Sequence, residues 1–241
     1  MSIKISQLAI EVTRRCNIRC SHCLRGEQEN KNISLSYISD LLDQVNSIGH
    51  IAFTGGEPSL NAIAISYTIN ECKKRNISIN TFFITTNGIN ISDDFVDVCK
   101  NLYALCEDKK NCDVQISNDY YHSIEHNYDD TKLKNLPFYS KRYKNDGDNL
   151  SNGDKLHKEG RSVKNYPNAK IRSGSATITS IKTFNSNTMY LNVNGDIING
   201  CDWSYTNQDS HKICDVKSLE SHYNMIEYVE DCAKNYEKSF S

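Results

Sequence analysis

The chain has 241 residues, a formal net charge of −2 and ten cysteines. This length can bury the core of one domain, or of one domain with a small appendage. A net charge so close to zero gives no general attraction to nucleic acid or to an anionic membrane surface, so neither is expected as a partner.

No apolar run in the sequence is long enough to span a bilayer, and the opening residues MSIKISQLAIEV lack the charged start and unbroken apolar stretch of a signal peptide. We therefore expect a cytoplasmic protein. In that compartment, closely spaced cysteines indicate metal binding or redox chemistry rather than disulfides.

Strands and helices are expected to alternate along the first half of the chain. Residues 8–13 alternate in polarity and predict a strand. Residues 34–49 place apolar side chains at helical spacing, with Ser34 as the N-cap and Gly49 as the stop. The same reasoning predicts strands at 50–56, 77–88 and 112–119, and helices at 60–76 and 93–106.

The second half is less regular. Residues 137–143 are expected to form a fifth strand, and the polar, Gly- and Asn-rich residues 144–155 an exposed loop. Residues 188–200 predict a β-hairpin that turns at Asn194-Gly195. The apolar spacing of residues 218–240 predicts a closing helix.

Alternating strands and helices predict a parallel sheet built from βαβ units, in an open sheet or a barrel-like α/β fold. In such folds the chemistry lies beyond the C-terminal ends of the strands. The unusual motifs all fall there: cysteines after the first strand, GGEP at 55–58, TTNG at 85–88 and SND at 117–119. Their common position predicts a single site.

The loop after the first strand, TRRCNIRCSHC, carries three cysteines: Cys16, Cys20 and Cys23. A structural zinc site would need a distant fourth ligand such as Cys72 or His50. A redox pair of Cys20 and Cys23 would leave Cys16 without a role. An iron–sulfur cluster accepts three cysteines when one iron stays open, and an open metal position is typical of a catalytic site.

This cysteine spacing after a first strand resembles the signature of the radical S-adenosylmethionine (radical SAM) superfamily. The resemblance extends to GGEP, TTNG and SND, and it covers the first half of the chain well and the second half loosely. It implies a partial (β/α) barrel over residues 1–174. Residues 175–241 would then form a C-terminal hairpin-and-helix segment packed on that core, within one domain or beside it.

In that superfamily three thiolates bind a 4Fe-4S cluster, S-adenosyl-L-methionine (SAM) chelates the fourth iron, and reductive cleavage gives a 5′-deoxyadenosyl radical that abstracts hydrogen from a substrate. The resemblance therefore implies an oxidoreductase with one cluster and SAM as cofactors, and a flavodoxin- or ferredoxin-like electron donor. The implied cluster ligands are Cys16, Cys20 and Cys23. The implied SAM-binding residues are His22, Gly55, Gly56, Glu57, Thr85, Asn87, Ser117 and Asp119.

Several of these residues also have a structural interpretation. The ring of His22 fits either beside adenine or as a space-filling group near the cluster. The GGEP stretch is also a tight turn before a helix, with Pro58 in the first turn. The same two interpretations apply to polar residues that are common at strand ends and helix caps: Thr85, Asn87, Ser117 and Asp119.

Two further pairs of residues each have two possible roles, one at the site and one as solvent-exposed side chains. Arg14 and Arg15 are expected either to help hold the SAM carboxylate or substrate, or to be solvated loop charges. His122 and His126 follow the fourth strand, where they either line the substrate pocket or face solvent.

The stretch GDIINGCDWSY, residues 195–205, resembles the start of the cysteine-rich extension (SPASM or twitch) of peptide-modifying members. No Cys-x-x-Cys pair follows residue 112, so no second cluster is expected. Cys201 is then either a thiol that returns a hydrogen atom to a substrate radical, as in some peptide epimerases of the superfamily, or a buried structural thiol.

The C-terminal resemblance favours a peptide or protein substrate, as in the maturation of a ribosomally made peptide. A glycyl-radical-enzyme activating enzyme and an enzyme for a small metabolite or nucleoside are the alternatives within the superfamily. Outside it, the alternatives are a zinc-stabilised binding module and an iron–sulfur electron carrier.

Overall fold

A computed structural model describes residues 3–142, 156–170 and 189–222. One eight-stranded sheet runs through these ranges in the order β5-β4-β3-β2-β1-β6-β7-β8. The strands are β1 (Ile3–Thr13), β2 (Val45–Gly55), β3 (Ser78–Thr86), β4 (Asp113–Ile116), β5 (Tyr139–Lys141), β6 (Met189–Leu191), β7 (Asp196–Asn199) and β8 (Lys212–Asp215). Strands β1 to β6 pair in parallel, whereas β7 pairs antiparallel with both β6 and β8.

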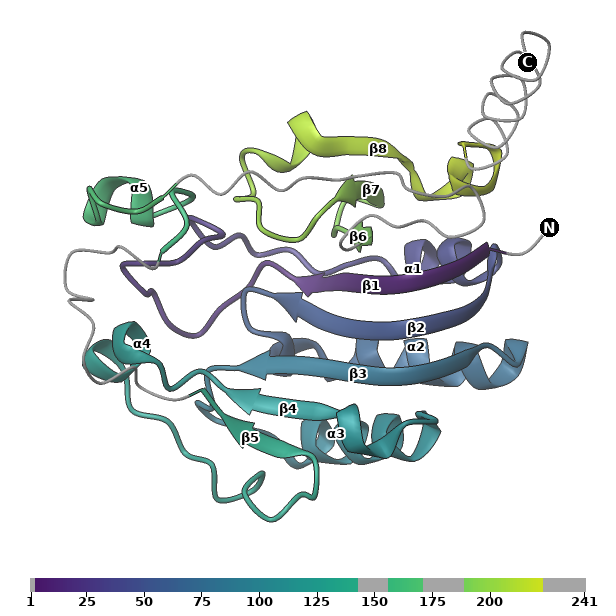
Figure 1. The fold of residues 1–241 in the computed structure, drawn as a ribbon, viewed down its shortest axis with the longest axis horizontal. Coiled ribbons are helices and arrows are strands. Elements are labelled where there is room, and N and C mark those ends of the chain that lie inside the picture. The colour runs from purple at the N-terminus through teal and green to yellow at the C-terminus, as the bar shows by residue number, and fades with distance from the viewer. Residues whose placement is uncertain (1–2, 143–155, 171–188, 223–241) are drawn as a thin grey trace, which may run out of the picture.

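Three helices cover one face of this sheet (Figure 1): α1 (Leu35–Leu42), α2 (Ala62–Arg75) and α3 (Asp93–Leu105). The parallel register places apolar side chains of neighbouring strands in one row beneath them, because alternate residues of a strand face the same side. One such row is Ile10, Phe53, Ile84 and Val114, each at most 1% exposed.

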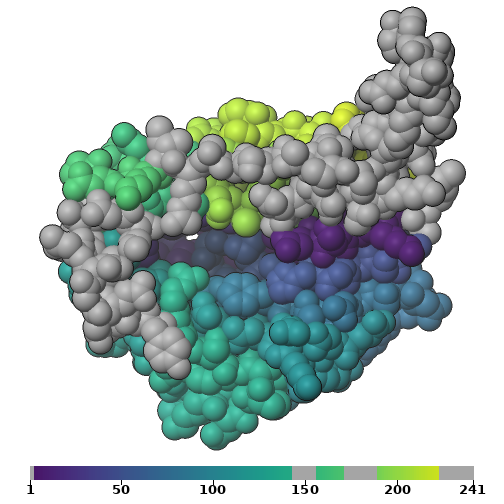
Figure 2. All heavy atoms as spheres, in the orientation of Figure 1, coloured from purple at the N-terminus to yellow at the C-terminus, as the bar shows by residue number. Residues whose placement is uncertain are grey.

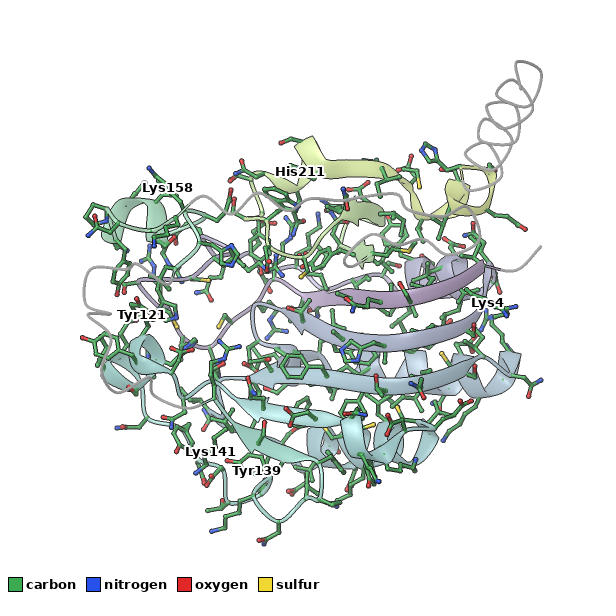
Figure 3. The ribbon with its side chains drawn as sticks, viewed as in Figure 1. Lys4, Tyr121, Tyr139, Lys141, Lys158 and His211 are labelled. Atoms are coloured by element: carbon green, nitrogen blue, oxygen red, sulfur yellow. The ribbon has the colours of Figure 1, made fainter. Side chains whose placement is uncertain are left out.

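A second, much smaller cluster of buried apolar residues is separate from this core and consists of Ala9, Tyr190 and Ile198. The face of the sheet opposite the three helices is the one seen in Figures 1 and 2. Figure 2 shows this face hollowed between the α5 segment and the strands of the N-terminal half. Two short helices lie at the end of the sheet where the parallel strands finish, namely α4 (Tyr120–Glu125) and α5 (Ser162–Asn165). Figure 3 shows Tyr121 of α4 and Lys158, just before α5, at that end, far from Lys4 near the start of β1.

The alternation of strands and helices confirms the predicted α/β class and parallel sheet. The fifth strand and the hairpin are also confirmed, and the hairpin turns where Gly195 has φ +85° and donates its N–H to Asn192. The loop predicted at 144–155 lies outside the described residues. The predicted closing helix begins at Leu219 and can be followed to residue 222.

The prediction of a helix over residues 34–49 is correct only for the first half of that range. Ser34 does cap α1, since its side chain accepts a hydrogen bond from the Ser36 N–H, but the helix ends at Leu42. Val45 and Ile48 belong to β2 instead, where Ile48 pairs with Ile5 of β1. Their β-branched side chains fit a buried parallel strand, and this tertiary pairing outweighs the local helical spacing.

Candidate functional site

The cysteine loop, residues 14–31, leaves β1 at the end of the sheet where α4 and α5 lie. Its three candidate ligands Cys16, Cys20 and Cys23 all line one cavity of about 590 Å³. The turn after β2 and the ends of β3 and β4 line the same cavity through Gly55, Gly56, Glu57, Thr85, Asn87 and Ser117. The motifs that the sequence placed at successive strand ends therefore meet at one site.

The three cysteine sulfurs are not gathered as closely as the ligands of one metal ion. Zinc–sulfur bonds of about 2.3 Å in a tetrahedron hold two sulfurs roughly 3.8 Å apart. Among the described residues, the groups whose ligand atoms all lie within 4.8 Å of one another are Cys20 with His22 and His122, and Cys20 with Glu125 and His126. Within the described part of the chain the three cysteines do not form such a group, and the cavity they line has the volume of a small-molecule site.

Burial sets the protonation of these thiols in the metal-free chain. Burial raises the pKa of the Cys20 thiol to about 12, with further contributions from Cys23 and Glu125, and burial likewise raises the pKa of Cys16. Both thiols are therefore protonated at neutral pH without a metal. Binding a metal centre would release these protons, as is general for thiolate ligands.

Glycine is required both at Gly55, the last residue of β2, and at Gly56 after it, because both contact the start of the cysteine loop. A Cβ on Gly55 would lie 2.0 Å from the carbonyl oxygen of Thr13, and one on Gly56 would lie 2.2 Å from that of Arg15. The Gly56 and Glu57 N–H groups donate to these same two carbonyls, each at 2.8 Å. The glycines thus dock the turn onto the start of the loop.

The Glu57 carboxylate, 2% exposed, is occupied by hydrogen bonds within the protein. It accepts from the Thr86 hydroxyl at 2.6 Å, the Asn87 N–H at 2.8 Å and the Ser59 N–H at 3.1 Å. The last of these caps the short 3₁₀ helix Pro58–Asn61. Glu57 therefore ties the turn after β2 to the end of β3.

The strand-end residues divide into two groups. Thr85 and Ser117 line the cavity, as does Asn87, whose amide donates to the Asn17 side chain at 2.8 Å and lies 4.0 Å from the Cys16 sulfur. Asp119 is not among the lining residues. It caps α4 by accepting from the His122 N–H at 3.1 Å.

His22 lies in a cluster of rings at the cavity wall. Its ring centre is 4.4 Å from that of His122 and 5.2 Å from that of Tyr121. Burial, together with the charge of His122, lowers the pKa of His22 to about 4, so the ring is neutral at pH 7. Its buried Nδ1 has no hydrogen-bond partner among the described residues.

Of the two arginines that open the loop, Arg14 is buried and Arg15 is exposed. The Arg14 guanidinium donates to Glu11 at 2.7 Å, to Glu29 at 2.9 Å and to Gln208 at 2.6 Å. Arg14 is therefore not a solvated charge, and its charge is already paired within the protein.

Cys201 does not line the cavity, although its neighbour Asp202 does. The half-buried Cys201 side chain packs with Trp203 against a small apolar cluster that includes Tyr190 and Ile198. Both the hydrogen-returning role and the buried-thiol role remain predictions.

Residues 156–170 also border the site, and sequence reasoning missed them. Arg161 and His157 line the cavity, and the Tyr166 hydroxyl lies 2.8 Å from the Ser21 hydroxyl of the cysteine loop. Glu125 of α4 accepts from the Ser21 N–H at 2.9 Å. No motif or periodic pattern in the sequence marks these residues as neighbours of the cysteines.

Comparison with known proteins connects this geometry to a family. Residues 10–136, more than half of the chain, match the family model described as Radical SAM superfamily. A GTP 3′,8-cyclase of Clostridium acetobutylicum is 47% identical over 91 residues, covering 35% of this chain and 28% of that protein. A GTP 3′,8-cyclase of Desulforamulus reducens is 33% identical over 92 residues, with the same coverages of 35% and 28%. The chain thus matches less than a third of the length of these relatives.

A solved structure described as native anSMEcpe with bound AdoMet and Cp18Cys peptide resembles the fold as a whole. It superposes with a TM-score of 0.52 at 14% identity, over 92% of this chain and 80% of that one. At this identity the likeness concerns the fold alone, and it confirms the predicted partial (β/α) barrel. Within the described residues, no helix has the length and apolar character needed to cross a membrane.

Proposed function

Since the chain belongs to the radical SAM superfamily, we propose that Cys16, Cys20 and Cys23 hold a single 4Fe-4S cluster whose open iron binds SAM. The observation that carries this proposal is the convergence of three cysteines and three strand-end motifs on one cavity. When bound, the reduced cluster supplies the electron that cleaves SAM into methionine and a 5′-deoxyadenosyl radical able to abstract hydrogen.

The surrounding residues would then bind and orient the cofactors. The Gly55-Gly56 turn, Thr85, Asn87 and Ser117 offer backbone and side-chain polar groups that line the cavity. We assign Glu57 to holding the turn, because its carboxylate already accepts three hydrogen bonds. Asp119 would act one step further away, through its hydrogen bonds to His122 at the cavity wall.

For the substrate we propose a peptide or protein. The resemblance of residues 195–205 to the start of a peptide-modifying extension supports it, and the solved neighbour is described with a bound peptide. A nucleotide is the second candidate, because the matched relatives are GTP 3′,8-cyclases and one is 47% identical over its 91 matched residues. An external electron donor is part of either proposal.

The test is anaerobic reconstitution with iron and sulfide, followed by turnover with SAM and dithionite. We expect about four irons per chain, a brown protein and a cluster spectrum that changes when SAM is added. Release of 5′-deoxyadenosine should rise when the substrate class is correct, so it is measured with GTP and with the Cp18Cys peptide in parallel.

Cys16→Ala, Cys20→Ala and Cys23→Ala should each lose most of the iron and of the 5′-deoxyadenosine. Cys112→Ala is the matched control, because Cys112 is buried just before β4 and does not line the cavity. A zinc-loaded protein, or a cluster that ignores SAM, would overturn the proposal. Stimulation by GTP but not by peptide would replace the peptide with a nucleotide.

A further inference from the structure

Arg161 holds the backbone of two of the three candidate cluster ligands. Its Nε donates to the carbonyl of Cys20 at 2.8 Å, and its own backbone N–H donates to the carbonyl of Cys23 at 2.9 Å. The side chain is 13% exposed and lines the cavity. One residue from a distant part of the chain therefore bridges the Cys-x-x-Cys end of the loop.

The segment around Arg161 is built for this contact. Gly160 has φ +57°, and a Cβ there would lie 2.4 Å from the carbonyl oxygens of both Cys23 and Leu24. On the other side of Arg161, the Asn165 amide donates to the Ser21 carbonyl at 2.8 Å. Backbone and side chains of this segment thus fit closely against the loop.

The charge of Arg161 is less compensated than that of Arg14 and Arg142, which also line the cavity. The Glu27 carboxylate with which it pairs is 3.5 Å away and 64% exposed, so solvent weakens the pairing. Arg14, by contrast, is 2.7 Å from the fully buried Glu11, and Arg142 is 3.1 Å from Asp119. Arg161 therefore places a weakly paired positive charge at the cavity wall.

Such a charge matters for a centre held by three thiolates. Positive charge and hydrogen bonds near an iron–sulfur cluster favour the reduced, more negative state, and outer residues orient the ligands themselves.

We propose that Arg161 is a positioning residue that clamps the cysteine loop and raises the reduction potential of the cluster bound there. This inference rests on the proposed function, because it requires the cluster at the three cysteines. Two separable consequences follow: the hydrogen bonds to the loop slow iron loss, and the positive charge sets the potential.

The test compares Arg161→Met, Arg161→Gln and Arg161→Lys with Lys164→Met after reconstitution. Lys164→Met is the matched control, because it removes one positive charge from an exposed site in α5, the short helix that follows Arg161. Two quantities are measured: the rate at which a chelator removes iron, and the midpoint potential from a redox titration followed by electron paramagnetic resonance.

Arg161→Met and Arg161→Gln should lose iron roughly 10-fold faster than the unaltered chain and should show a more negative potential. Arg161→Lys should keep the potential and still lose iron faster, because an ammonium group cannot reproduce the fixed guanidinium geometry. Lys164→Met should match the unaltered chain in both measurements.

Equal iron-loss rates in Arg161→Met and Lys164→Met would overturn the clamp, and equal potentials would overturn the electrostatic role. If Arg161→Met does not fold, Arg161→Gln and Arg161→Lys carry the same comparison. Failure of the unaltered chain to bind a cluster would instead reject the proposed function, so the two failures are distinguishable.

Discussion

Gly55 is required by its packing within the protein, whether or not it also contacts a cofactor. The resemblance implied that Gly55 and Gly56 bind SAM. In the structure Gly55 closely approaches β1, with the Thr13 carbonyl oxygen 2.0 Å from where a Cβ would sit. The turn that borders the cavity is therefore fixed before any cofactor binds.

Gly55→Ala should destabilise the protein more than Gly200→Ala. Both glycines have positive φ values, +149° and +81°, but a Cβ at Gly200 would have no neighbour closer than 3.6 Å. The difference isolates the clash, for which we expect about 1–3 kcal/mol of unfolding free energy. Urea denaturation of the metal-free variants measures it, and equal losses would show that the backbone oxygen yields easily.

The sequence predicted which side chains lie at the site better than it predicted the role of each side chain. The sequence correctly brought Thr85, Asn87 and Ser117 to the cavity, since strand order and strand ends follow from the βα pattern. It did not show that the Glu57 carboxylate would accept three hydrogen bonds within the protein, and it left Asp119 open between SAM binding and the helix-capping role found here. Such roles depend on partners brought together only by the tertiary fold.

At the scale of the element, β1 joins the cysteine loop to the C-terminal strands. Glu11, near the end of β1, is fully buried and accepts from the Tyr190 hydroxyl at 2.6 Å and the Gln208 amide at 2.8 Å. Arg14 bonds both Glu11 and Gln208. The start of the loop is thus fastened to two C-terminal segments.

Glu11→Gln should cost far more stability than Glu29→Gln, although both glutamates pair with Arg14. Glu11 is 0% exposed and its loss leaves a buried guanidinium undercompensated, for which we expect about 3 kcal/mol. Glu29 is 44% exposed, and an exposed pair contributes about 0–1 kcal/mol. Urea denaturation of both variants checks this, and similar small losses would show that water reaches the Glu11 network.

Elements with a long, clear period were predicted from the sequence, whereas some of the short elements were not. Helices α2 and α3 appear within a few residues of their expected bounds. Strand β8 was missed because four residues carry too little alternation, and α5 because it is equally short. The segment 34–49 was misassigned because Val45 and Ile48 suit a helix by spacing and a strand by shape, and pairing with β1 decides between them.

At the scale of the whole molecule, the sheet is continuous from the N-terminal barrel strands to the C-terminal hairpin. Strand β6 pairs in parallel with β1, between β1 and β7. The proposed boundary near residue 174 lies outside the described residues and stays a prediction. A sheet shared in this way favours the single-domain alternative, because removing β6 to β8 would expose Leu8 and Ile10 backbone groups and the buried Glu11.

The full chain should therefore unfold in one cooperative transition. Trp203 is the sole tryptophan of the chain and stacks on His211 with ring centres 3.4 Å apart, so its fluorescence reports on the C-terminal part. Far-UV circular dichroism reports mainly on α1, α2 and α3, which cover the barrel strands. The two signals should share one urea midpoint, because a shared sheet and a buried polar network couple the two parts.

Trp203→Phe provides the blank for the fluorescence signal. A fluorescence midpoint clearly below the dichroism midpoint would mean that the hairpin unfolds before the rest of the sheet. That result would support the alternative of a core and a separate C-terminal segment.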